Sequence, residues 1–317
     1  MFSVSAFERN GRVPPRYVVS ASPSKQVRFL RVAIDGRPSA VDEPPAEILF
    51  SRRLTLRRAI TELWRFRELV YVLAERDFRS RYKQAVLGFA WALVGPLVLV
   101  LVLGLLFQRV VEVDTNGTPY VLFSYIGVLP WTFFSASINQ GGLSLLNNAQ
   151  LINKVYAPRE VFPLAAVGVA GVDLVLSLVA LAVLFVITGE YPQPTSFWVV
   201  PLFVVQLAFT VGCTVLISAV VVRLRDVRHI LPIVLQLGLF ATPVAYGMND
   251  LAQGKAVYVY AAINPLAPVI DGYRRCVLWG EAPQWGPVGV AAVVSFAILL
   301  GGYRLFKRLE VGIADAA

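Results

Sequence analysis

Few acidic side chains in this chain are placed to do chemistry, and one of them interrupts an apolar segment. Asp173 lies near the middle of the apolar run 161–188. A carboxylate inside such a segment is costly and usually faces a cavity or finds a partner. Two interpretations stay open: a polar contact along a transport path, or a structural group. A structural carboxyl would bond a neighbouring helix or stay protonated through burial.

Motifs for independent catalysis are absent from the sequence. Gly254-Lys255 is followed by Ala256 and lacks the earlier glycine of a phosphate-binding loop. Neither H-E-x-x-H nor G-x-S-x-G occurs, and the chain has 1 His and 2 Cys. Glu112 and Asp114 form an acidic pair on a short loop, the candidate site if the protein were a lipid-modifying enzyme. We therefore predict no catalytic residues, no metal site and no cofactor bound by this chain.

Composition and charge distribution predict an all-α membrane protein. Of the 317 residues, 57% are hydrophobic and 15% are charged, whereas soluble domains carry about 45–50% and about 25%. Six charge-poor segments are each long enough to cross about 30 Å of hydrocarbon as a helix. A porin-like barrel would instead show alternating polar and apolar residues. The predicted spans are residues 87–107, 119–140, 161–188, 196–222, 230–249 and 285–303.

The basic residues predict the orientation of these spans. The net charge is +9, and a positive bias on cytoplasmic loops explains it better than nucleic-acid binding. With a cytoplasmic N-terminus, the cytoplasmic flanks hold about three times as many lysines and arginines as the opposite side. The sequence thus predicts a multi-pass protein of a cytoplasmic membrane with both termini inside.

The segments outside the spans divide into four predicted parts. Residues 1–53 form a cytoplasmic extension, either flexible or carrying a small hairpin. Residues 54–83 show helical periodicity with one apolar stripe, which favours an amphipathic helix in the membrane interface over one packed on a soluble partner. The six-span domain occupies residues 84–310 and the tail residues 311–317. Residues 256–270 are apolar, short and interrupted by Pro265 and Pro268, which favours a re-entrant hairpin over a seventh span.

Four segments together resemble one transporter family. They are RDFRSRYKQAVLGFAW (76–91), NAQLINKVYAPREVFP (148–163), RDVRHILP (225–232) with TPVAY (242–246), and INPLAPVIDGYR (263–274). Their order and placement between spans resemble the permease subunit of type-2 ATP-binding-cassette exporters of polysaccharides. This group serves O-antigen, capsule and teichoic acid export. The resemblance covers about residues 60–310 and leaves the first 50 or so outside.

The resemblance implies partners and roles for individual residues. It implies a second copy of this chain, two separate ATPase subunits that bind ATP and magnesium, and a short coupling helix at 147–157 that docks into the ATPase. It implies contact with a lipid-linked glycan and with membrane lipid, and none with nucleic acid. The coupling residues are Leu151, Ile152, Lys154, Tyr156 and Arg159. Three further groups of site residues belong to other parts of the chain: Asp77, Arg81, Tyr82 and Lys83 in the interface helix and at the entry to the first span, Arg225, Asp226 and Arg228 in the cytoplasmic fourth loop, and Asn264, Pro265, Tyr273 and Arg274 in the re-entrant hairpin.

Aromatic residues near span ends suggest a channel lining, because sugars stack on aromatic faces. Belt or packing positions are the commoner use of such residues. An O-antigen-like glycan is the predicted cargo; teichoic acid or a small lipid or drug is the alternative. The candidates for the lining are Trp91, Tyr125, Trp131, Phe134, Asp173 and Tyr246.

Overall fold

The computed structural model describes residues 64–82, 90–110, 115–152, 157–248 and 254–313, and every regular element in these ranges is helical. The side chains of residues 90–92, 107–110 and 310–313 are not described. The elements are α3 (Arg67–Tyr82), α4 (Ala90–Val110), α5 (Tyr120–Asn147), α6 (Ala149–Ile152), α7 (Val161–Thr188), the 3-10 helix η1 (Pro194–Trp198), α8 (Val199–Arg223), α9 (Val227–Ala241), α11 (Ala256–Ile263), α12 (Leu266–Arg274), the π-helix η2 (Arg275–Trp279) and α13 (Trp285–Ile313).

Four helices of the described residues are long and apolar enough to cross a membrane. They comprise Tyr120–Asn147, Val161–Thr188, Pro194–Arg223 and Trp285–Leu309. Two shorter apolar helices, Leu93–Leu106 and Val227–Ala241, correspond to the first and fifth predicted spans. The all-helical membrane fold is therefore confirmed, while the count of six spans stays a prediction.

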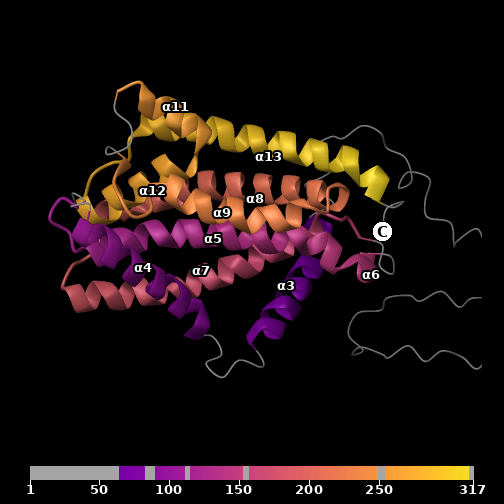
Figure 1. Cartoon of the computed structure of the whole chain (residues 1–317), viewed down its shortest axis with the longest axis horizontal. Coiled ribbons are helices and arrows are strands. Elements are labelled where there is room, and N and C mark those ends of the chain that lie inside the picture. The colour runs from indigo at the N-terminus through magenta and orange to yellow at the C-terminus, as the bar shows by residue number, and fades with distance from the viewer. Residues whose placement is uncertain (1–63, 83–89, 111–114, 153–156, 249–253, 314–317) are drawn as a thin grey trace, which may run out of the picture. The chain divides into compact units, whose positions relative to one another are not determined.

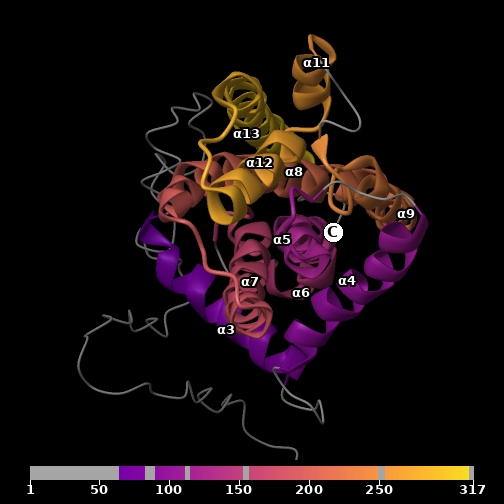
Figure 2. The ribbon, with the colours of Figure 1, turned by 90° about the vertical axis from the view of Figure 1, so that its left-hand side faces the viewer.

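Helix α5 lies at the centre of the bundle. It packs between α7 and α8, with α4 and α9 to one side, and α13 runs along α8 (Figure 2). Helix α3 crosses α7 obliquely, and α6 lies at the end opposite α11 and α12 (Figure 1). A core cluster surrounds α5, in which the ring of Phe134 stacks on that of Phe209 at 5.2 Å.

A buried polar bridge joins α5, α8 and α12 at a proline in the middle of α5. Pro130 has no N–H group, so its turn of the helix lacks one backbone hydrogen bond. The Nε2 group of Gln206 donates to the Pro130 carbonyl over 3.0 Å. The hydroxyl of Tyr273 in turn donates to Oε1 of Gln206 over 2.7 Å. Each polar atom of this bridge has a partner, as a dry interior requires.

Close packing of α8 on α13 depends on Gly212. A Cβ atom at this position would lie 2.7 Å from the backbone nitrogen of Leu299 and 2.8 Å from its Cα atom. Because these neighbours are backbone atoms, no side-chain rotation can make room. Small residues commonly permit such close contact between membrane helices, since apolar lipid supplies no hydrophobic drive for association.

Several predicted span ends differ from the structure, and two of them have a clear physical reason. Helix α5 continues past the predicted end at Gln140 to Asn147, because the polar residues there face a cavity rather than ending the helix. Helix α9 ends at Ala241, short of the predicted end at Asn249, although the segment stays apolar. Pro243 explains this, since the residue before a proline is disfavoured in helical geometry, and Thr242 is extended.

The remaining segment predictions stay predictions, although parts of these segments lie in the described residues. Leu73 of α3 is buried against α7, and Phe66 and Val70 pack on the same cluster. Helix α13 runs on to Ile313, past the predicted span end at Tyr303. Residues 1–53 lie outside the described residues, as do 54–63 of the predicted interface helix, 153–156 of the predicted coupling helix and 314–317.

Candidate functional site

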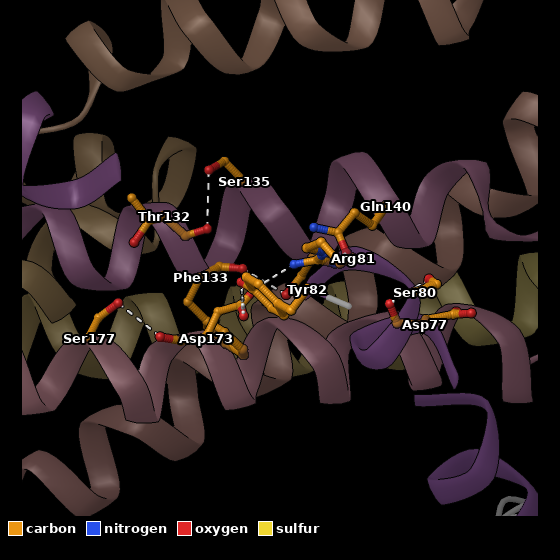
Figure 3. A network of polar contacts seen from close by, with 11 residues as sticks. Asp77, Ser80, Arg81, Tyr82, Thr132, Phe133, Ser135, Gln140, Asp173 and Ser177 are labelled. Atoms are coloured by element: carbon orange, nitrogen blue, oxygen red, sulfur yellow. Dashed lines mark hydrogen bonds and ion pairs between the residues drawn. The ribbon is translucent and has the colours of Figure 1, made fainter. Parts of the chain in front are cut away.

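A polar network joins α3 to α5 and α7 in the middle of an otherwise apolar bundle (Figure 3). Arg81 of α3 forms an ion pair with Asp173 of α7, with 2.5 Å between Nη1 and Oδ2. It also donates to the side-chain oxygen of Gln140 on α5. The hydroxyl of Tyr82 donates to the other Asp173 oxygen over 2.8 Å. Arg81 thus links α3 both to the Asp173 carboxylate of α7 and to Gln140 of α5.

The environment of Asp173 explains how a charged group is tolerated in α7. Its side chain is 20% exposed, and that of Arg81 is 33% exposed. Burial raises the pKa of Tyr82, and the hydrogen bond and charge of Asp173 raise it further, so Tyr82 stays a protonated donor. Of the two interpretations of Asp173, bonding to a neighbouring helix is what the structure displays. A position along a transport path stays a prediction.

A second group of polar contacts joins α3 to the start of α6. Nη2 of Arg76 donates to Oδ1 of Asn148 over 2.7 Å, and Arg76 also pairs with its neighbour Asp77. The amide of Asn148 donates to the carbonyl of Ser144 over 2.9 Å, which fixes its orientation at the end of α5. The segment that leads into α6 is therefore bonded to α3.

A polar cavity of about 530 Å³ lies between the Arg81 network and the contacts of Arg76 with Asn148. Its walls come from α3, α5 and α7, and most of the side chains that line it are polar. The lining residues are Arg76, Asp77, Ser80, Arg81, Asn139, Gln140, Leu143, Ser144, Asn147, Asn148, Ala166 and Val169.

A buried ion pair holds the start of α7 against α13. Glu160 is 1% exposed, and its Oε2 atom lies 2.7 Å from Nζ of Lys307. The hydroxyl of Tyr303, one turn earlier on α13, donates to the other oxygen over 3.1 Å. Sequence reasoning missed these residues. The available signal in the sequence was an ionisable residue directly before one apolar run, together with a basic residue at the end of another run.

The predicted coupling residues are described only in part. Leu151 and Ile152 lie in α6, half-buried against the cluster that contains Leu73, and Arg159 is half-buried in the turn before α7. Lys154 and Tyr156 lie outside the described residues. Helix α6 comprises four described residues, shorter than the predicted helix 147–157.

The predicted loop residues and the hairpin lie at opposite ends of α9. Arg225, Asp226 and Arg228 are exposed before or at the start of α9. Beyond its other end, α11 and α12 meet at Asn264 and Pro265. Tyr273 and Arg274 are buried at the end of α12. At the approach to the first span, Asp77, Arg81 and Tyr82 border the cavity or its network, and Lys83 lies outside the described residues.

Three of the predicted channel residues pack in the core of the single chain. Tyr125, Trp131 and Phe134 are buried, and the Tyr125 hydroxyl donates to the carbonyl of Ser177 over 3.1 Å. Tyr246 is half-buried and donates to the carbonyl of Phe240 over 2.6 Å. The side chain of Trp91 is not described. This burial favours packing roles, while contact with a transported sugar stays a prediction.

No group of three or more His, Cys, Asp or Glu side chains within the described ranges could hold a metal ion. The polar groups of this site are instead arginines, carboxylates and amides that join helices to one another. Such an arrangement can transmit displacement between elements and can bond polar groups at a membrane surface.

Comparison with known proteins gives a consistent set of relatives. The family described as ABC-2 type transporter matches residues 68–278. The chain is 32% identical over 263 residues to the O-antigen export system permease protein RfbA of Myxococcus xanthus, covering 82% of this chain and 99% of that protein. It is 26% identical to RfbA of Klebsiella pneumoniae, covering 78% and 94%. It is 23% identical to the polysialic acid transport protein KpsM of Escherichia coli, covering 76% and 93%.

Proposed function

The chain belongs to the ABC-2 type transporter family, and we propose that it is the membrane-spanning subunit of an ATP-driven exporter of lipid-linked polysaccharide. The cargo is an O-antigen-like glycan carried across the bacterial cytoplasmic membrane. The similarity to an O-antigen export permease over 99% of that relative's length carries this proposal. The protein is a transporter subunit rather than an enzyme.

Six spans with both termini in the cytoplasm complete the proposed topology. The four long apolar helices supply four spans, and α4 and α9 supply the others. At about 1.5 Å per residue, the 15 residues of α9 reach about 22 Å, short of the hydrocarbon thickness. The buried turn after α9 and the re-entrant hairpin α11–α12 fill the remaining depth, which non-helical backbone can do when protein surrounds it.

A separate ATPase supplies the energy, with ATP and magnesium bound there. The absence of a phosphate-binding loop from the sequence supports this division of labour. The segment 149–159 is the proposed contact with the ATPase. Two bonds flank it: Arg76 with Asn148 before it, and Glu160 with Lys307 after it. A push on this segment would therefore act on α3, α7 and α13 together.

A second copy of this chain completes the proposed pathway. Helices α4 and α9 both carry large apolar side chains that are exposed in the single chain. Lipid or a partner helix covers such surfaces equally well. The family relationship favours a partner, since two permeases would enclose a path that one bundle leaves open. The exposed side chains include Leu101, Leu105, Ile233, Leu237 and Phe240.

Deletion and complementation in the native bacterium test the proposal. We expect loss of this chain to abolish surface glycan and to cause undecaprenyl-linked glycan to accumulate inside the cell. The wild-type chain restores export only together with its ATPase. Normal surface glycan with drug sensitivity would instead establish a small lipid or drug as cargo, and export or transferase turnover without any ATPase would refute the proposal.

The double variant Lys154→Ala with Tyr156→Ala tests the docking segment. We expect it to weaken co-purification with the ATPase or to separate ATP hydrolysis from export, because both side chains belong to the segment that would enter the ATPase. Tyr191→Ala is the matched control, since this exposed residue lies beyond the opposite end of α7. Normal export by the double variant would place the docking segment elsewhere.

A further inference from the structure

The turn that follows α9 has its backbone carbonyl groups bonded by side chains from other elements. Thr242, Val244 and Ala245 are buried, so water does not serve these groups. Unsatisfied buried carbonyl groups are costly, and the cost is greater in a membrane. Arg274 donates to the carbonyls of Pro243 and Tyr246, both over 2.8 Å, and to that of Val244. The hydroxyl of Tyr120 donates to the carbonyl of Ala245 over 3.0 Å.

Arg274 is the centre of this arrangement. It is 1% exposed, and its Nε group also donates to the carbonyl of Phe123 on α5 over 3.0 Å. The guanidinium carbon lies 3.7 Å from the centroid of the Phe123 ring, a cation–π contact. The planar fork of an arginine suits several acceptors at once, whereas a lysine offers a single charged group. One side chain at the end of α12 thus bonds both α5 and the turn after α9.

Gly127 on α5 leaves the space that this side chain needs. A Cβ atom at residue 127 would lie 2.6 Å from the carbonyl oxygen of Val244 and in still closer contact with Nη2 of Arg274. The turn, the guanidinium group and α5 therefore fit together without room for one additional methyl group.

Helix α11 bonds the same turn from a third direction. The Tyr260 hydroxyl donates to the carbonyl of Ala241 over 2.5 Å. Nδ2 of Asn264, between α11 and α12, donates to the Thr242 hydroxyl over 2.8 Å. We name Arg274, Tyr260 and Asn264, with the turn 241–246, the α9 clasp. It bonds the hairpin α11–α12 to the end of α9 at several points.

Along the rest of its length, α9 is much less constrained. Leu231 is the one buried residue among its fifteen. Ile233 and Leu237 are 59% and 65% exposed in the single chain. The helix runs from the exposed segment 225–228 towards α12 (Figure 1). Within its own chain, α9 is therefore held mainly through Leu231, the contact of Gly238 with Trp131 and the clasp at its end, so a displacement of α9 would reach the clasp.

We propose that Arg274 is a positioning residue that makes the end of α9 and the hairpin α11–α12 move as one body. Displacement of α9 during the ATPase cycle then moves the hairpin at the opposite end of the bundle. This inference rests on the proposed function, since it needs a cycle that displaces α9. Transport does not touch Arg274 itself; the residue acts through the carbonyl groups that it holds.

Distance measurements between spin labels test this transmission in the full transporter with its ATPase in lipid vesicles. One pair joins Ile263 of the hairpin to Ile187 of α7, and a second joins Arg228 at the start of α9 to Val175 of α7; all four are exposed in the single chain. In the wild type we expect both distances to change when ATP is trapped. In Arg274→Lys the α9 distance still changes, but the hairpin distance does not.

Export and ATP hydrolysis give the second readout. We expect Arg274→Lys to lower glycan export about tenfold, within the range of a lost coupling between two sites, while ATP hydrolysis persists. Arg275→Lys is the matched control, because Arg275 pairs with Asp271 and Glu281 and not with the turn. In Arg275→Lys, the changes in both label distances and the rate of glycan export should match those of the wild type.

The clasp offers a milder variant if Arg274→Lys does not fold. Tyr260→Phe with Asn264→Ala removes the hydrogen bonds of both side chains to the turn and leaves the arginine in place. We expect it to reduce the hairpin displacement. Unchanged hairpin displacement in either folded variant, or an equal loss in Arg275→Lys, would overturn the inference. Absence of ATP-dependent export by the wild type would instead count against the proposed function.

Discussion

The buried pair between Glu160 and Lys307 allows a quantitative test of how α7 is held against α13. Glu160 is 1% exposed and the Lys307 side chain 13% exposed, with 2.7 Å between their charged atoms. Removing one partner of a buried pair costs about 3–5 kcal/mol, because the remaining charge stays desolvated. The Tyr303 hydroxyl still donates to the carboxylate, so we expect about 3 kcal/mol for Lys307→Met.

The losses of unfolding free energy in the two single variants should differ, and they should not add up in the double variant. Glu160→Gln leaves the amine of Lys307, whose long side chain can extend towards solvent, so we expect a smaller loss of about 1–2 kcal/mol. The double variant buries no isolated charge and should lose only about 1–2 kcal/mol. The magnitude of the coupling energy from the double-mutant cycle is then about 2–4 kcal/mol.

Unfolding of the purified chain in detergent micelles with increasing denaturant measures these free energies. Arg308→Met is the matched control, since Arg308 is exposed next to Lys307 and should change stability by less than about 0.5 kcal/mol. Strictly additive single-variant costs, or a loss for Arg308→Met as large as for Lys307→Met, would refute a desolvated pair at this position.

Two further changes test the other contacts between helices. Asp173→Ala should destabilise the chain by about 1–3 kcal/mol, because it removes the acceptor for Tyr82 and the α3 arginine. Asp173→Asn should lose less unfolding free energy, and equal losses for the two variants in denaturant unfolding would contradict this. Gly212→Ala should destabilise by about 1–3 kcal/mol through its collision with the Leu299 backbone, whereas Gly301→Ala, with open space, should stabilise by about 0.5–1 kcal/mol. Thermal unfolding distinguishes the two glycine variants, and a matching shift in both would contradict the packing of α8 on α13.

The apolar runs predict the helices. The ends of a helix can be predicted only where residues that stop a helix stand on both sides of the run. Helix α7 has the predicted bounds 161–188, since Pro158 precedes it and Gly189, with φ +73°, follows it. The end of α5 was placed too early, because Asn139 and Gln140 resemble a loop in sequence. Their side chains instead face a cavity that only the packing of α3 creates.

The partners of the ionisable residues could not be predicted, because they come from distant parts of the chain. Asp173 and Arg81 are 92 residues apart, and no local pattern pairs them. The sequence places Arg274 in the predicted hairpin but gives no sign that this charged side chain is buried. Sequence reasoning can flag a charge within or beside an apolar run, but three-dimensional packing decides whether it faces solvent, a carboxylate or a set of carbonyl groups.

Helix α3 at the α6 end and the turn after α9 at the hairpin end are held by bonds of different kinds, and this difference has a mechanical consequence. At the α6 end, the exposed side chain of Arg76 bonds α3 to Asn148, and exposed contacts of this kind contribute at most about 1 kcal/mol each. The buried pair of Glu160 with Lys307 at the same end joins α7 to α13 and does not hold α3. At the hairpin end, Arg274 holds a buried turn through several hydrogen bonds at once. A force applied near α6 would therefore rearrange contacts there, whereas the hairpin and the end of α9 would shift without separating. Under the proposed function, the contacts of α3 would change at the end that the ATPase drives, and the hairpin with the end of α9 would follow.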